Sequence, residues 1–192
     1  MEKNINNIIE RKEEIRKEIN RRLREQDPLI REEKSGKIQK KLLTLHEFQA
    51  CRTVMLYVSL PAEVDTRGIL EEALKQGKRV VVPYIGRDSR EITASELKAM
   101  EYLEKGPLGI FQPGESFLNK VPLKEIDLIV VPGIAYDKKN MRLGRGKGYY
   151  DRFLSNEELL FSDTIGIAFS FQVVDALPVC PHDRPVSMVI TD

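Results

Sequence analysis

Glycines alternate with cations in one stretch of the chain, Gly144-Arg145-Gly146-Lys147-Gly148, and two tyrosines and an aspartate follow directly. Glycines let backbone N–H groups converge on an anion, because no Cβ stands in the way. A helix predicted to begin near Tyr149 would point its free N–H groups at the same place. Arg145 and Lys147 would add full positive charges, and Asp151 could hold a hydrated Mg²⁺ that bridges phosphates. The pattern therefore favours a phosphate or nucleotide site.

The same stretch does not match the common nucleotide-binding motifs. It lacks the GxxxxGK[ST] spacing of a P-loop, and it lacks the glycine spacing and acidic partner of a dinucleotide fingerprint. An aromatic RNA-binding signature is disfavoured, because Tyr150 stands where a small residue is needed and Asp151 adds negative charge. A solvated turn with a helix cap and a basic surface for nucleic acid remain open as alternatives.

Two cations of a helix predicted at residues 3–25 fall inside its apolar stripe. Lys12 and Arg16 are one turn apart, so they repel each other and lose hydration unless an anion meets them. Long stems that carry the charged heads to water are one explanation. The other is a second phosphate clamp that faces the ligand site. The stripe is formed by Ile5, Ile8, Ile9, Ile15, Ile19 and Leu23.

Carboxylates outside the glycine-rich stretch are further candidates. Glu63 follows a predicted strand and could accept hydrogen bonds from the N–H groups of a ligand, or it could be an ordinary solvated carboxylate. Asp183 could complete a metal site with Asp151, or it could pair with Arg184. His182 could be a base, a ligand or neither.

Continuous apolar runs alternate with helical segments, which predicts an α/β fold. We expect a three-layer, mostly parallel sheet with helices on both faces, Rossmann-like, and N-terminal helices at 3–47 packed on it, in a single domain at 1–192. The predicted strands are 54–60, 79–85, 126–137, 164–170 and 187–191. The predicted helices are 3–25, 28–47, 67–76 and 149–160, with a short helical piece near 95–104.

In such sheets ligands bind beyond the carboxyl ends of the strands. The loops after Leu60, Ile85, Ala135 and Ser170 should therefore share one rim, and the glycine-rich stretch lies on the loop after the third of these strands.

Bulk composition excludes few function classes. The chain has 192 residues, with 31 Lys and Arg against 30 Asp and Glu, so net charge gives no argument for a polyanionic partner. Cys51 and Cys180 stand far apart without CxxC spacing, which disfavours a disulfide framework or a zinc knuckle. The N-terminus lacks a signal-type apolar run, and no apolar run is long enough to span a bilayer. We expect a cytoplasmic protein with reduced thiols.

The run VVPGIAYDKKNMRLGRGKGYYDRFL at 130–154 closely resembles the signature of the 5-formyltetrahydrofolate cyclo-ligases, also called methenyltetrahydrofolate synthetases. The spacing of Lys12 and Arg16 is similar to a basic pair of that family. SLPAEVDT at 59–66, GIFQP at 109–113 and His-Asp at 182–183 are similar to further family elements, so the resemblance extends over essentially the whole chain. Two departures are Leu108, where some relatives carry an aromatic near the nucleotide, and the segment 90–97, which is more aromatic in relatives.

The resemblance implies ATP-dependent cyclisation of 5-formyltetrahydrofolate to 5,10-methenyltetrahydrofolate, with Mg²⁺ as cofactor and ATP as co-substrate. It implies small-molecule partners, no nucleic acid and no membrane, and we expect a monomer. Another ATP-dependent activity on the same scaffold is the alternative. By family match, ATP would be held by Lys12, Arg16, Arg142, Leu143, Gly144, Arg145, Gly146, Lys147, Gly148, Tyr149 and Tyr150. The folate would be held by Val58, Glu63, Arg145, Gly146, Lys147, Gly148 and Tyr149. Lys147 and Arg145 would be catalytic, and Asp151 and Asp183 would hold Mg²⁺.

Overall fold

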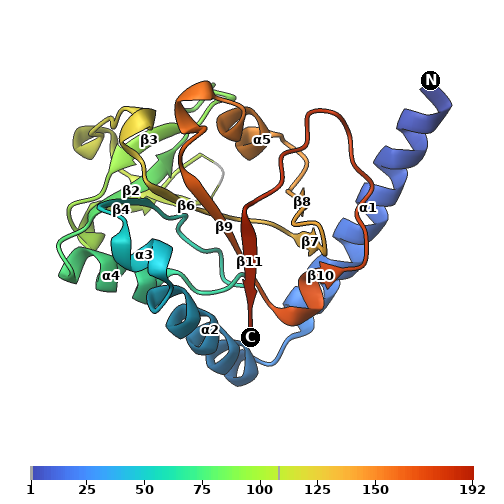
Figure 1. Ribbon diagram of the computed structural model, residues 1–192, viewed down its shortest axis with the longest axis horizontal. Coiled ribbons are helices and arrows are strands. Elements are labelled where there is room, and N and C mark those ends of the chain that lie inside the picture. Colours follow the sequence, from blue (N-terminus) through green and yellow to red (C-terminus); the bar gives the residue numbers. More distant parts are fainter. Residues whose placement is uncertain (1, 108) are drawn as a thin grey trace.

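The computed structural model describes residues 2–107 and 109–192. Leu108, the predicted departure near the nucleotide, lies outside the described residues. A six-stranded sheet runs through the molecule in the order β11-β9-β6-β1-β2-β3 (Figure 1). All neighbours are parallel except β2 and β3, which are antiparallel. The strands are β1 Thr53–Met55, β2 Arg79–Tyr84, β3 Thr93–Glu96, β6 Leu128–Val131, β9 Asp163–Ala168 and β11 Met188–Thr191. The predicted mostly parallel sheet is confirmed.

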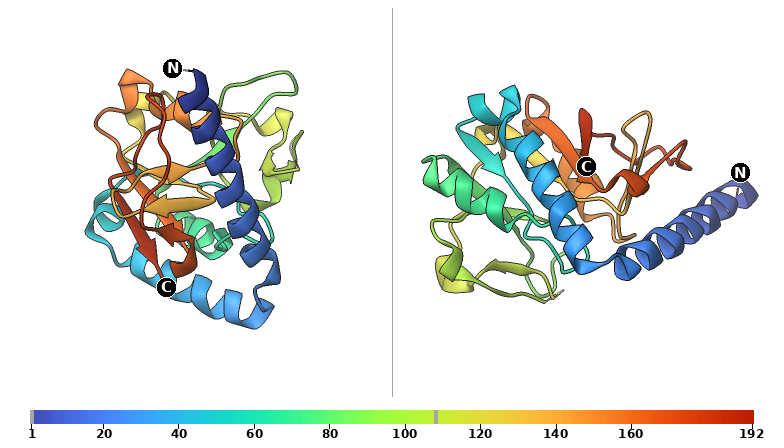
Figure 2. Two further views of the ribbon diagram at one scale, coloured as in Figure 1. Left: turned by 90° about the vertical axis from the view of Figure 1, so that its right-hand side faces the viewer. Right: turned by 90° about the horizontal axis from the view of Figure 1, so that it is seen from below.

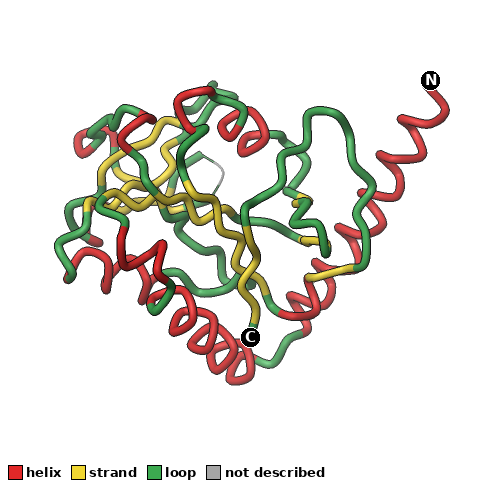
Figure 3. The backbone as a smooth tube through the Cα atoms, in the orientation of Figure 1, coloured by secondary structure: helices red, strands yellow, loops and turns green. Residues whose placement is uncertain are grey.

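Helices cover both faces of the sheet, as the continuous apolar strands require. Successive side chains of a strand point to opposite faces, so Val54 and Met55 enter two different core clusters. Ile38 and Leu70 pack in the first cluster, on the face covered by α2 (Pro28–Leu43), α3 (His46–Ala50) and α4 (Arg67–Lys75). Phe153 packs in the second, on the face covered by α5 (Tyr149–Leu154) and the 3-10 turns η3 (Leu123–Glu125) and η4 (Glu157–Leu159). The tube in Figure 3 shows these helices on either side of the strands.

The long helix α1 (Glu2–Glu25) lies against a second, three-stranded sheet rather than the main one. That sheet has the order β10-β7-β8, with β7 Ala135–Asp137, β8 Arg142–Leu143 and β10 Val173–Val174, and the turn η5 (Ser170–Gln172) precedes β10. The side chains of Ile19 and Leu23, in the C-terminal half of α1, are buried in the core. Its N-terminal end extends past the body of the molecule (Figure 2). Among the described residues, no helix has the length and apolarity needed to cross a membrane.

The helix predicted at 28–47 is two helices. The side chain of Asp27 accepts from the N–H groups of Leu29 and Ile30, which begins α2. The hydroxyl of Thr44 donates back to the carbonyl of Lys40, and Leu45 then takes an extended conformation. A side chain that satisfies a terminal carbonyl in this way competes with continuation of the helix, so α2 ends at Leu43 and α3 begins at His46.

Two predicted strands are shorter than expected. The first was predicted at 54–60, but β1 is Thr53–Met55, although the residues that follow remain buried up to Ser59. The strand predicted at 126–137 is split, because Pro132 has no N–H to donate to a ladder and the chain turns there. A Cβ at Gly133 would lie 2.6 Å from the ring of Tyr136. Residues 135–137 consequently join the small sheet as β7.

Two predicted helical segments are also corrected. Residues 93–96 form the antiparallel edge strand β3, so the helical piece near 95–104 is reduced to the 3-10 turn η1 (Met100–Tyr102). The helix predicted at 149–160 ends at Leu154, where the hydroxyl of Ser155 donates to the carbonyl of Asp151 and Asn156 caps the separate turn η4. An extended arm made of β4 (Leu103–Lys105) and β5 (Phe111–Pro113) follows η1 and is succeeded by η2 (Glu115–Phe117). The stacked rings of Tyr102 and Phe117 close its base.

Candidate active site

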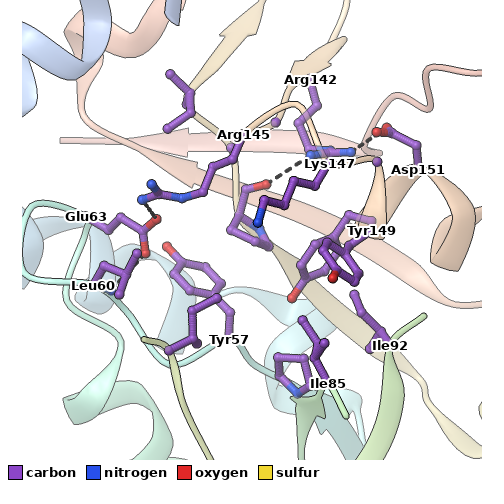
Figure 4. Close-up of a pocket in the computed structure, with 18 of the residues that line it drawn as sticks. Tyr57, Leu60, Glu63, Ile85, Ile92, Arg142, Arg145, Lys147, Tyr149 and Asp151 are labelled. Carbon is purple, nitrogen blue, oxygen red and sulfur yellow. Dashed lines mark hydrogen bonds and ion pairs between the residues drawn. The ribbon is translucent and has the colours of Figure 1, made fainter. Parts of the chain in front are cut away.

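A cavity of about 240 Å³ lies at the carboxyl ends of β1, β2 and β6. Three of the predicted rim loops contribute to it, those after Leu60, Ile85 and Ala135, whereas the loop after Ser170 does not. One wall of the cavity is apolar and the other is basic (Figure 4). The lining residues are Tyr57, Val58, Leu60, Glu63, Pro83, Ile85, Ile92, Ile110, Gln112, Pro132, Gly133, Ile134, Arg142, Gly144, Arg145, Lys147, Gly148, Tyr149, Tyr150 and Asp151.

The glycine-rich stretch forms the basic wall, between β8 and α5. Gly146 and Gly148 have φ values of 92° and 68°, a backbone region that favours glycine. Gly144 has another reason to lack a side chain, because its Cβ would lie 2.7 Å from a guanidinium nitrogen of Arg142. α5 has only six residues, so full side-chain charges rather than a long helix dipole make this wall attractive to anions.

Arg142 lies beneath the glycine-rich stretch. Its side chain is 2% exposed and donates to Asp151 Oδ1 at 2.5 Å and to the carbonyl of Pro132 at 3.3 Å. Its guanidinium also lies 5.8 Å from the ring centre of Tyr150. The Nε of Arg142 and the hydroxyl of Tyr150 are buried without a hydrogen-bond partner within the described part of the chain. Both residues line the cavity, and these two unpartnered donors lie beneath its surface.

Arg145, from the glycine-rich stretch, pairs with Glu63, from the loop after β1. The guanidinium of Arg145 donates to Glu63 Oε1 at 2.7 Å, and the backbone N–H of Leu60 donates to Oε2 at 2.9 Å. Figure 4 shows this pair on one side of the cavity, the Arg142–Asp151 pair on the other, and Lys147 between them. In the region that the structure describes, the ammonium of Lys147 forms no ion pair. The full charge of Lys147 is consequently available to a bound anion.

Tyrosines supply neutral donors to the cavity. Burial raises the pKa of the Tyr57 phenol well above its ordinary value, and the nearby carboxylate of Glu63 adds to the effect. Burial likewise raises the pKa of Tyr150, although Arg142 opposes the rise. The hydroxyl of Tyr149 donates to the carbonyl of Ser89 at 3.1 Å, which ties α5 to the loop after β2. The phenols of Tyr57 and Tyr150 therefore stay protonated across the physiological range and can act as hydrogen-bond donors.

The cations in the apolar stripe of α1 do meet an anion, and it comes from the chain itself. Lys12 is 8% exposed, and its ammonium lies 2.5 Å from Asp183 Oδ2, which also accepts from the N–H of Cys180. The guanidinium of Arg16 donates to the carbonyl of Gly144 at 2.8 Å and lies 3.5 Å from where a Cβ of Gly146 would be. α1 thus supports the glycine-rich stretch from behind.

The predicted site residues are only partly gathered in one place. Lys12, Arg16, Leu143, Gly146 and Asp183 do not line the cavity, and the other ten do. The predicted pairing of Asp183 with Arg184 does not occur in the structure. Arg184 instead donates to the hydroxyl of Ser155, and His182 is exposed, with its Nε2 3.9 Å from Asp183.

A cation site made by protein side chains alone is not present in the described ranges, where no three His, Cys, Asp or Glu residues cluster. Asp183 is committed to Lys12. Asp151 uses Oδ1 for Arg142 and faces the cavity, with 18% of its side chain exposed. Mg²⁺ typically takes one or two carboxylates and completes its octahedron with phosphate oxygens and water. Asp151 therefore fits a Mg²⁺ that arrives with a phosphate ligand.

The apolar wall was missed in the sequence. It contains Pro83, Ile85, Ile92, Ile110 and the aliphatic part of Gln112, from the end of β2, the loop before β3 and the β4–β5 arm. Pro83 and Ile85 lie in the strand predicted at 79–85, and Ile110 and Gln112 lie in the family element GIFQP, but none of these residues was assigned to the site. The position of Ile85 at the rim was the signal that could have found the wall.

The family model for the 5-formyltetrahydrofolate cyclo-ligase family matches residues 8–192. Among curated relatives, a 5-formyltetrahydrofolate cyclo-ligase of Mus musculus is 32% identical over 184 residues, covering 92% of this chain and 91% of the relative. A probable 5-formyltetrahydrofolate cyclo-ligase of Schizosaccharomyces pombe is 36% identical over 194 residues, covering 94% and 95%.

Solved structures give the same match in three dimensions. The NMR structure of Aquifex aeolicus 5,10-methenyltetrahydrofolate synthetase superposes with a TM-score of 0.82 at 34% identity, covering 94% of this chain and 89% of that one. A 5,10-methenyltetrahydrofolate synthetase from Mycoplasma pneumoniae superposes with a TM-score of 0.75 at 27% identity, covering 94% and 98%. The likeness is therefore to whole chains, not to one motif.

Proposed function

This chain belongs to the 5-formyltetrahydrofolate cyclo-ligase family, and we propose that it converts 5-formyltetrahydrofolate and ATP to 5,10-methenyltetrahydrofolate, ADP and phosphate. The observation that carries the proposal is a single cavity with two unlike walls. The basic wall presents Arg145 and Lys147 to phosphates, and the apolar wall, with Glu63 beside it, suits a flat heterocycle. Both substrates of the reaction would thus meet in one place.

In the first step, the formyl oxygen attacks the γ-phosphorus and the bond to the β,γ-bridging oxygen breaks, which releases ADP. The nucleophile belongs to the substrate, so the protein needs no covalent intermediate of its own. Catalysis then comes mainly from positioning and from stabilising charge on the transferring group. Lys147, with its uncommitted ammonium, would balance the equatorial phosphate oxygens, and Arg145 would join it when it leaves Glu63.

In the second step, N10 attacks the activated formyl carbon, N10 loses its proton, and the formyl oxygen departs with the phosphate. Glu63 would accept from the pterin N–H groups and hold N10 near the carbon. Its Oε2 is already fixed by the N–H of Leu60, and a carboxylate held in this way keeps further lone pairs for a ligand.

Asp151 would carry a Mg²⁺, which supplies charge neutralisation to the phosphates when bound. Arg142 fixes the carboxylate through Oδ1, which leaves Oδ2 for the ion. Asp183, the second predicted Mg²⁺ ligand, would have to release Lys12 before it could bind the ion.

Turnover is the direct test of the proposal. Purified protein is mixed with 5-formyltetrahydrofolate, ATP and MgCl₂, and the near-ultraviolet absorbance of the methenyl product is followed, with reactions lacking ATP or MgCl₂ as controls. We expect product only in the complete reaction. No product with active substrates would refute the folate activity, and phosphoryl transfer to other acceptors would then select another ATP-dependent enzyme on this scaffold.

We further propose a cytoplasmic monomer that binds small molecules and not nucleic acid. Three cations support the absence of nucleic-acid binding, because Arg142 is buried with Asp151, Arg145 pairs with Glu63 and Lys138 pairs with Asp175. An electrostatic nucleic-acid surface would need such cations free and would bind with steep salt dependence. Binding of a labelled oligonucleotide at low salt, and the mass in solution by light scattering, check these two points.

A further inference from the structure

The side chain of Gln112 joins the β4–β5 arm to the end of β2. Gln112 is 6% exposed, and its amide makes two hydrogen bonds with one backbone unit: Ile85 N–H donates to Oε1 at 3.0 Å, and Nε2 donates to the carbonyl of Ile85 at 3.2 Å. A glutamine that pairs with both the backbone N–H and the backbone C=O of one residue makes the hydrogen bonds that a neighbouring strand would otherwise make. The arm is thereby fastened to the sheet at the point where Ile85 enters the cavity.

Gln112 also separates two hollows. On one side is the cavity already described, and on the other is a more polar one of about 620 Å³, lined by Arg87, Glu104 and Lys105 among others. Ile85 and Gln112 line both. The hydrogen bonds of the Gln112 amide therefore fix the position of Gln112 and Ile85, which separate the two hollows. Their position sets the width of the apolar end of the first cavity.

Gly106, at the end of the arm, explains how the glutamine reaches this place. A Cβ on Gly106 would lie 2.6 Å from Cδ and 2.9 Å from Cγ of Gln112. The φ of Gly106 is not positive, so alanine would fit the backbone there and would act only by displacing the glutamine. Gly106 does not line the first cavity.

We propose that Gln112 is a positioning residue for the folate: by clasping Ile85 it holds the apolar wall against which the folate ring system packs, and Gly106 is a glycine to make room for it. The inference rests on the proposed function. ATP phosphates belong at the basic wall, so loss of the clasp should weaken folate binding and leave nucleotide binding nearly unchanged.

Four variants test the inference. Gln112→Leu keeps the volume and removes both hydrogen bonds, and Gly106→Ala displaces the glutamine. Gln112→Ala and the double variant Gly106→Ala with Gln112→Ala complete a double-mutant cycle. Dissociation constants for 5-formyltetrahydrofolate and for a non-hydrolysable ATP analogue with MgCl₂ are measured by calorimetry. KM and kcat are measured by turnover. Gly36→Ala is the matched glycine control, because nothing lies within 4 Å of its added Cβ and it is on α2, outside the cavity.

We expect Gln112→Leu and Gly106→Ala each to raise the folate Kd about tenfold, the effect of losing two neutral hydrogen bonds. The Kd of the ATP analogue should change less than twofold. Gly106→Ala should add nothing on top of Gln112→Ala, since the Cβ then has no glutamine to displace. Gly36→Ala should leave both constants alone.

The inference is overturned if Gly106→Ala leaves the folate Kd unchanged, or if the folate and ATP constants rise together in either variant. Gly106→Ala keeps the test decisive even if Gln112→Leu fails to fold. Failure of the proposed function is seen separately, as absence of folate turnover in the wild-type protein.

Discussion

The two walls of the cavity are built in opposite ways. The basic wall comes from one continuous stretch, Arg142–Asp151, whose glycines and cations sit in sequence order. The apolar wall is assembled from the end of β2, the loop before β3 and the β4–β5 arm. The difference teaches that a short local motif can encode a phosphate site, because such a site depends on backbone conformation and charge. A surface for a flat ring instead needs apolar atoms from segments that are distant in the sequence.

The largest effect should come from the support behind the basic wall. Lys12→Met would leave Asp183 buried without its ion-pair partner, which typically costs about 3–5 kcal/mol. Chemical denaturation should show a loss of that order, and Lys17→Met, an exposed lysine of the same helix, should change stability by less than about 0.5 kcal/mol. Equal stability of Lys12→Met and wild type would mean that α1 is not held by this pair.

The basic wall itself should control turnover. Lys147→Ala removes the cation that has no ion-pair partner in the described residues, and kcat should fall about 100- to 1000-fold, the usual cost of one group that stabilises charge in the transition state. The folate Kd and the denaturation midpoint should stay near wild type. Lys139→Ala, at an exposed lysine in the turn between β7 and β8, is the control. A Lys147→Ala enzyme with full kcat would remove Lys147 from the mechanism.

Between the walls, Glu63→Gln should act mainly on the folate. The amide keeps the shape but loses the charge, so the folate Kd should rise about 10- to 100-fold, as for hydrogen bonds to a charged group. Arg145 would also lose its partner, and the ATP analogue should bind no more weakly than to wild type. Calorimetry with both ligands separates the effects. Glu71→Gln on α4 serves as control, and a larger loss for ATP than for folate would contradict the assignment.

The smallest effect is expected from Lys138→Ala. Its ion pair with Asp175 spans 2.7 Å, but both side chains are largely exposed, at 73% and 91%. Solvent screens such exposed pairs, so they contribute little to stability. The free energy of unfolding of the variant should therefore stay close to that of the wild type. A larger loss would show that the turn between β7 and β8 depends on this exposed ion pair. The stability effects of Lys138→Ala and Lys12→Met would then differ less than we expect.

Much of the fold could be predicted, because burial on both faces of a parallel sheet leaves continuous apolar runs in the strands. The errors fell where local chemistry interrupts a run. Pro132 ends one strand, Thr44 ends one helix, and Ser155 and Asn156 end another. At the site, the predicted residues on the glycine-rich stretch line the cavity except Gly146, while Lys12 and Asp183 pair with each other.

The sequence by itself determined the mostly parallel sheet and the pattern of glycines and cations at Gly144–Gly148, since these depend on strand patterning and on residue types within short windows. Only the tertiary structure decided which charges remain available. Lys12 and Asp183 are 171 positions apart, and Arg145 and Glu63 are 82 apart. Such pairs exist only once the fold has placed both partners, because an ion pair needs its atoms within a few ångströms and the sequence sets no distance between remote residues. The two hydrogen bonds between Gln112 and Ile85 likewise form only when the fold brings these distant residues together.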